Sequence, residues 1–89
     1  MFRLIIIFEL NSETEIVDAL ASIQRQLADS SLIIHGETGV DPDRMRLSIL
    51  ADFQTAADAD TWIHGKEKRN IDYELGDPKE TFLCYYRNE

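Results

Sequence analysis

Three side chains could do acid–base chemistry in this chain: His35, His64 and Tyr85. Cys84, the only cysteine, is the one candidate for a nucleophile that a histidine could activate. It lies in the middle of an apolar run, however, and we interpret it as an inert residue of the core or of the sheet surface. Histidine and cysteine spacings typical of a zinc site are missing from the sequence, as is a glycine-rich phosphate loop. The sequence therefore favours a protein without catalytic residues, metal or cofactor.

Carboxylates are the most numerous charged groups. The chain has 17 acidic and 9 basic residues, which gives a net charge of −8. The negative electrostatic potential of such a chain repels the phosphates of nucleic acids and favours a basic partner. Acidity also keeps a small protein in solution. Glu37, Asp41 and Asp43 could hold a weakly bound calcium ion, but their order differs from that of an EF-hand loop.

The elements that must position these groups occur in a repeat. Residues 2–20 and 45–63 align without a gap, so that Arg3 matches Arg46 and Glu9 matches Asp52. In each copy a nearly continuous apolar run is followed by a helix cap, a serine or threonine with an acid three residues later. Each copy therefore predicts a buried strand that leads into a helix.

The spacing of apolar residues, caps and turn residues predicts six elements with their connections. In the first half we expect a strand at Phe2–Leu10, a helix at Glu13–Ala28 capped by Ser12 and Glu15, and a short strand at Leu32–His35. A hairpin-type loop at Gly36–Arg44 leads to the second half, with a strand at Met45–Phe53 and a helix from the cap Thr55 to Gly65. A polar loop at Asn70–Lys79, with an extended piece at Ile71–Leu75, precedes the last strand at Thr81–Arg87.

The order β-α-β-β-α-β predicts a ferredoxin-like α+β fold. Two right-handed βαβ units combine most simply into a four-stranded antiparallel sheet of order 4-1-3-2, with both helices on one face. A chain of 89 residues is expected to form one domain, residues 1–89. One cysteine and the lack of a membrane-spanning or leader segment favour a soluble protein of the cytoplasm.

Charge complementarity predicts how the two central strands pair. Opposite charges meet across the ladder when Arg3 lies opposite Asp52 and Glu9 opposite Arg46. The same register leaves Ile5, Ile7 and Leu50 on the face without helices. We expect this apolar centre to be covered by a partner, because contiguous apolar surface on a small protein usually marks an interaction site.

Acidic residues are predicted at both ends of the sheet. The first acidic rim, where Lys66, Lys68 and Arg69 would also lie, consists of Glu9, Glu13, Glu15, Glu37, Asp41 and Asp43. The second acidic rim, which Arg3 and Arg87 would face, consists of Asp52, Asp58 and Asp60, with Asp29 nearby.

Three functions are consistent with these features. The first is a non-enzymatic protein–protein interaction module, a small inhibitor that blocks a basic nucleic-acid-handling protein by presenting carboxylates where phosphates would lie. The second is a homodimer of the dimeric α+β barrel kind, which binds a ligand or regulates and packs through the open sheet face. The third is an enzyme of that kind without a cofactor, with its site between sheet and helices. Direct binding to nucleic acid or membrane is not expected.

Overall fold

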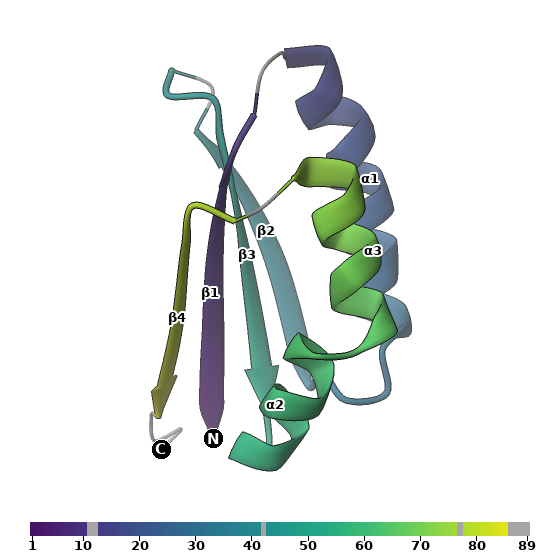
Figure 1. Cartoon of the computed structure of the whole chain (residues 1–89), viewed down its shortest axis with the longest axis vertical. Coiled ribbons are helices and arrows are strands. Elements are labelled where there is room, and N and C mark those ends of the chain that lie inside the picture. The colour runs from purple at the N-terminus through teal and green to yellow at the C-terminus, as the bar shows by residue number, and fades with distance from the viewer. Residues whose placement is uncertain (11–12, 42, 77, 86–89) are drawn as a thin grey trace.

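Two antiparallel strands form the centre of the sheet. The computed structural model describes residues 1–10, 13–41, 43–76 and 78–85. In it β1 (Phe2–Glu9) pairs with β3 (Arg46–Phe53), while β2 (His35–Asp41) pairs with β3 and β4 (Glu80–Tyr85) pairs with β1. The order β2-β3-β1-β4 is the predicted order read from the other edge, and the ferredoxin-like α+β fold is confirmed (Figure 1).

The register between the central strands is also as predicted. Arg3 lies opposite Asp52 and Glu9 lies opposite Arg46. Between these charged pairs, Ile5 is level with Leu50 and Ile7 is level with Ser48. The alternation of β1 and β3 therefore places one apolar set under the helices and leaves the second on the open face.

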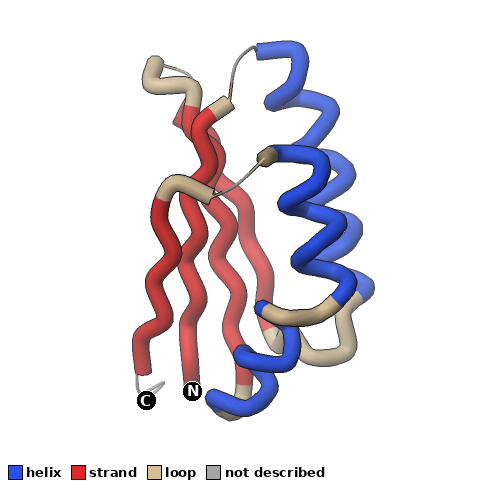
Figure 2. The backbone as a smooth tube through the Cα atoms, viewed as in Figure 1, coloured by secondary structure: helices blue, strands red, loops and turns tan. Residues whose placement is uncertain are grey.

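Helices cover only one face of the sheet (Figure 2). The described residues form three of them, α1 (Glu13–Asp29), α2 (Ala56–Ile63) and α3 (Lys66–Leu75). The prediction of two helices is therefore corrected, because the stretch expected to be polar loop with an extended piece at Ile71–Leu75 lies mostly in α3. α2 ends at Ile63 with His64 as its C-cap, just before the predicted stop at Gly65, and Gly65 is the N-cap of α3.

The helix caps are confirmed where the structure describes them. Thr55 has extended backbone angles, and its hydroxyl accepts a hydrogen bond from the Asp58 N–H at 3.1 Å. Ser12 of the first predicted cap lies outside the described residues, as do Tyr86 and Arg87 of the predicted last strand. The first helix ends one residue later than predicted, at Asp29.

The second strand lies further along the chain than predicted. Leu32–His35 was expected to be the strand and Gly36–Arg44 the loop, but β2 occupies His35–Asp41. Leu32 and Ile33 instead pack against the edge of the core, and the Ile34 N–H donates to the Asp52 carbonyl at 2.8 Å. The loop is correspondingly short.

The core lies between the helices and the inner face of β1 and β3. Its fully buried large side chains are Leu4, Ile6, Phe8, Ile23, Leu47, Ile49, Phe53, Trp62 and Ile71. The edge strand β4 is left outside this core, since Leu83 and Tyr85 point to the helix side of the sheet yet are 45% and 64% exposed. None of the helices in the described ranges has the length and apolar character needed to span a bilayer.

Candidate functional site

The open sheet face has an apolar centre. In register across three strands, Leu50 lies beside Ile5, and Ile5 lies beside Phe82. Ile7 follows Ile5 on the same face, and these three aliphatic side chains are partly exposed while Phe82 is 47% exposed. Ile5, Ile7 and Leu50 were predicted here, and the pairing of β1 with β4 adds Phe82 to the same face.

One end of this face carries paired charges, not a free acidic rim. Glu9 contacts the Lys79 ammonium at 2.8 Å and the Arg46 guanidinium at 3.6 Å. The hydrogen bond and charge of Lys79, with a smaller effect of Arg46, lower the pKa of Glu9 below its ordinary value of 4.5. Asp41, opposite Arg46 on β2, also lies 3.9 Å from Arg44.

The bases expected at this rim are elsewhere. Lys66, Lys68 and Arg69 lie in the first turn of α3, where Lys68 is buried and bonds to Asp72 at 2.6 Å. The Arg69 guanidinium contacts the Gly65 carbonyl. The prediction that these three bases lie at the first acidic rim is therefore wrong, and Lys79 is the lysine that pairs with Glu9.

Among the other residues of the first acidic rim, the structure places Glu37 away from Glu9. Glu37 lies in the middle of β2, level with Leu50, and bonds to His35 at 2.8 Å. Its predicted place at the rim is therefore wrong, because the strand begins later than expected. Asp43 is exposed in the turn before β3. Glu13 and Glu15 belong to the first turn of α1, and their side chains lie outside the described residues.

The second acidic rim contains one buried carboxylate. Asp52 is only 3% exposed and accepts two hydrogen bonds from the Arg3 guanidinium, at 2.9 and 3.1 Å. Asp58 and Asp60 lie on α2, and Asp60 is 3.3 Å from the His64 ring. Only the two residues on α2 therefore offer carboxylates to solvent.

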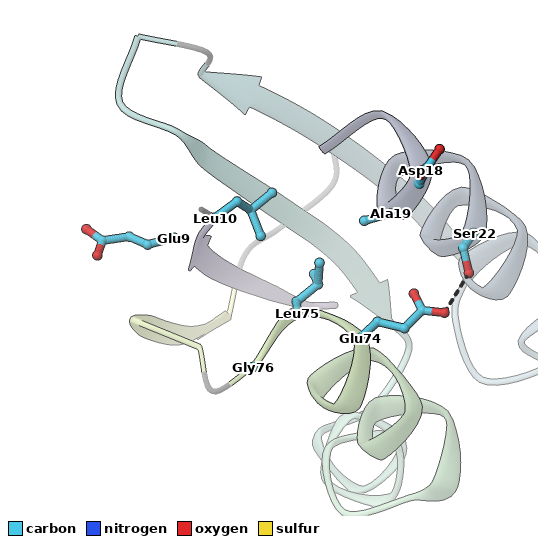
Figure 3. Close-up of a pocket in the computed structure, with 8 residues that line it drawn as sticks. All are labelled: Glu9, Leu10, Asp18, Ala19, Ser22, Glu74, Leu75 and Gly76. Atoms are coloured by element: carbon cyan, nitrogen blue, oxygen red, sulfur yellow. Dashed lines mark hydrogen bonds between the residues drawn. The ribbon is translucent and has the colours of Figure 1, made fainter. Parts of the chain in front are cut away.

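A cleft opens on the other side of the sheet, where the end of β1 meets α1 and α3 (Figure 3). Its volume is about 490 Å³, within the ~300–1,000 Å³ range typical of small-molecule sites. The residues that line it are Glu9, Leu10, Asp18, Ala19, Ser22, Glu74, Leu75 and Gly76.

The cleft combines an apolar floor with polar walls. Leu10 and Ala19 are buried and Leu75 is partly buried, so these side chains form the floor. Above them the Ser22 hydroxyl donates to Glu74 at 3.1 Å and thereby joins α1 to α3 (Figure 3). The Glu9 side chain points away from the cleft, toward Lys79.

The predicted acid–base residues do not line this cleft. His35 is on β2, His64 is at the end of α2, and Tyr85 packs edge-on against Phe2 with ring centroids 5.3 Å apart. Cys84 is exposed on the open face, level with Arg3. Within the described ranges, no three histidine, cysteine or acidic side chains come together as metal ligands, so the weak calcium site at Glu37, Asp41 and Asp43 is not formed there.

Sequence reasoning missed Asp18, Ser22 and Glu74 as a group. Ser22 and Glu74 lie 52 residues apart, and Glu74 was placed in a loop. The available signal was the spacing of Lys68, Ile71 and Leu75, which is helical and continues to a terminal glycine.

Comparisons with known proteins identify the fold. Neither a protein-family model nor a curated protein sequence matches the chain. The fold is similar to that of Rv0793 from Mycobacterium tuberculosis, with 11% identity, a TM-score of 0.76 and coverage of 99% of this chain and 96% of that one. It is also similar to a dimeric ferredoxin-like protein of unknown function from Thermobifida fusca, with 12% identity, a TM-score of 0.76 and coverage of 96% and 90%.

A third similar structure is that of an antibiotic biosynthesis monooxygenase. It is 12% identical, has a TM-score of 0.71, and is matched over 99% of this chain and 100% of that one. At these identities the likeness establishes a shared ferredoxin-like fold.

Proposed function

We propose that this protein is a homodimer in which two copies pack through their open sheet faces, and that each copy binds a small molecule in its cleft. The observation that carries the proposal is the apolar centre of the open face, formed by Ile5, Ile7, Leu50 and Phe82. A sheet face meant only for water would present polar residues at these alternating positions. The Thermobifida fusca neighbour is described as dimeric, which supports a dimer but not a particular interface.

The charges around the apolar centre are suited to the rim of an interface. Arg3 with Asp52 lies on one side, and Glu9 with Arg46 and Lys79 lies on the other. These charges are already paired within one copy. Two further carboxylates lie on this face, Glu37 beside Leu50 and Glu80 beside Ile7, so a second copy must leave them solvated or offer them a cation.

Light scattering after size exclusion tests the dimer. The wild type should have twice the chain mass of 10.2 kDa at both low and high salt, because apolar contacts are not screened. Ile5→Asp and Phe82→Asp should each give a folded monomer. Val17→Asp is the matched control, since Val17 is 68% exposed on α1, away from the open face. A wild-type monomer, or a dimer that survives both substitutions, would contradict the proposal.

Ligand binding, not oxygenation, is the role that we propose for the cleft. One neighbour is described as a monooxygenase, which makes such chemistry the alternative. Against it, His35, His64 and Tyr85 all lie outside the lining of the cleft. Among the described lining residues, only carboxylates and one serine could move protons there.

An acidic docking surface for a basic protein remains a second proposal. The net charge of −8 supports it, as do the exposed Asp60 and the partly exposed Asp58 on α2. Binding of such a partner should weaken as salt rises, and Asp58→Lys with Asp60→Lys should abolish it. Binding that is independent of salt would count against this role.

A further inference from the structure

We propose that the cleft selects molecules in which an apolar body carries a cationic amine. This inference rests on the proposed function, since it names the class of ligand for the same cleft. It follows from three features of the lining: an apolar floor, one carboxylate held in a fixed position, and the charge balance of the walls.

The apolar floor of the cleft favours a ligand with an apolar body. Leu10, just after β1, Ala19 on α1 and Leu75 on α3 present hydrocarbon to the cleft. A ligand that covers them removes apolar surface from water on both sides, which stabilises the complex by about 25 cal/mol per Å². A small hydrophilic cation without such a body would gain nothing from this floor.

A chain of hydrogen bonds fixes the carboxylate. Gln26 Nε2 donates to Ser22 Oγ at 3.1 Å, and Ser22 in turn donates its only proton to Glu74 Oε1 at 3.1 Å. Glu74 is therefore held as an acceptor, while its Oε2 has no hydrogen-bond partner in the part of the chain that the structure describes. A group that approaches this oxygen must donate a hydrogen bond, and the strongest such donor is a cation.

The described walls of the cleft carry exposed carboxylates. Asp18 and Glu74 are exposed there, and none of the described lining residues is a lysine, arginine or histidine. Glu9 adds little, because its carboxylate points away and is paired with Lys79 (Figure 3). In a chain of net charge −8, this arrangement attracts amines and repels phosphates and carboxylates.

Three probes share a phenylalkyl group and differ in the charge of the polar end, so they separate the effect of charge from that of shape. They are 4-phenylbutylamine, 4-phenylbutan-1-ol and 4-phenylbutyrate. Each is titrated into the full chain at neutral pH and low salt, and binding is followed by amide chemical shifts. Shifts should be largest around Leu10, Ala19, Ser22, Leu75 and Gly76. We expect the amine to bind about tenfold more tightly than the alcohol, and the carboxylate to bind most weakly.

Glu74→Gln should remove the preference for the amine and leave the affinity for the alcohol unchanged. Glutamine keeps an oxygen that can accept from Ser22, so the bridge between α1 and α3 is retained. Asp29→Asn is the matched control, because it removes one negative charge at the end of α1, outside the cleft.

The outcomes distinguish the two proposals. Equal binding of amine and alcohol at the cleft amides, or tightest binding of the carboxylate, would overturn the selection of cations and leave the cleft as a binding site. If no probe shifts the cleft amides, both the ligand class and the binding role of the cleft are wrong, whatever mass light scattering gives for the dimer.

Discussion

The two halves of the molecule share a plan of strand and helix but cover the sheet differently. β1 leads into one long helix, α1, whereas β3 leads into the two shorter helices α2 and α3. In the alignment of the repeat, Trp62 takes the position of Ala19, and Gly65 takes the position of Ser22. The second half therefore has a large buried indole where the first has an alanine, and a glycine where the chain turns between α2 and α3. The strands of the two copies are therefore alike and pair at the centre of the sheet, whereas the helices that cover them differ in number and length.

The charged pairs of the two halves differ in the same way. The repeat relates Arg3 with Asp52 to Arg46 with Glu9. Arg3 makes two hydrogen bonds to a carboxylate that is 4% exposed, whereas Arg46 lies 3.6 Å from one that is 51% exposed. Equivalent residues thus form a buried bidentate pair at one end of the sheet and a solvated network at the other.

Trp62→Ala gives the largest effect expected from this comparison. The indole is 2% exposed, packs against Phe53 with ring centroids 5.9 Å apart, and donates to Glu67 at 2.8 Å, which joins α2 to α3. Its loss should lower the free energy of unfolding by about 3–5 kcal/mol in urea titrations. Ala19→Gly, at the equivalent position, should cost only about 1 kcal/mol. Similar losses of unfolding free energy in Trp62→Ala and Ala19→Gly would contradict the view that the two halves are packed differently.

Gly65→Ala should have the next largest effect. A Cβ at this position would lie 2.9 Å from the Thr61 carbonyl oxygen, so the turn between α2 and α3 would have to open. We expect a loss of about 1–3 kcal/mol in the free energy of unfolding, also measured by urea titration. An unchanged value would show that the two helices can shift apart at little cost.

Arg3→Leu and Arg46→Leu compare the two charged pairs directly. Arg3→Leu removes two hydrogen bonds to a buried carboxylate and should cost about 1–3 kcal/mol, toward the lower value because the Arg3 side chain is 37% exposed. Arg46→Leu should cost less, because Lys79 still pairs with Glu9. Thermal unfolding of both variants at neutral pH measures the difference, and the reverse order would refute it.

Lys79→Gln should have the smallest effect on stability, and it should change the pKa of one group, the Glu9 carboxyl. In the wild type the lowered pKa of Glu9 contributes stability that is present above the ordinary value of 4.5 and is lost as pH falls through the lowered value. Without Lys79 the pKa should rise toward 4.5, and Arg46 alone should keep it slightly lowered. Titration of the Glu9 carboxyl by NMR measures this shift. A pKa that does not move would assign the effect to Arg46.

The central strands could be predicted from the sequence because several local signals agree there. Alternation, opposite charges and the repeat all favour the same pairing of Arg3 with Asp52 and Glu9 with Arg46, and the structure has that pairing. The apolar open-face residues Ile5, Ile7 and Leu50 follow from it.

The second strand and the third helix could not be predicted in the same way. β2 contains Gly36 and Gly39, whose strand conformation depends on pairing with β3 and not on propensity. The segment of α3 is so polar that it resembles a loop, yet Ile71 is fully buried and the buried Lys68 places its ammonium over the Phe8 ring, 6.0 Å from the centroid. Both elements depend on contacts with distant parts of the chain, and the cleft residues on α3 were missed for the same reason.

Pairing of β1 with β4 also bears on how the chain folds. Phe2 lies opposite Tyr85, so this ladder joins residues from nearly opposite ends of the chain. Closing so large a loop costs more entropy than forming the hairpin of β2 and β3, and the reward is small because every residue of β4 is exposed. β4 should therefore dock late during folding, and its amides should exchange with solvent before those of the other strands.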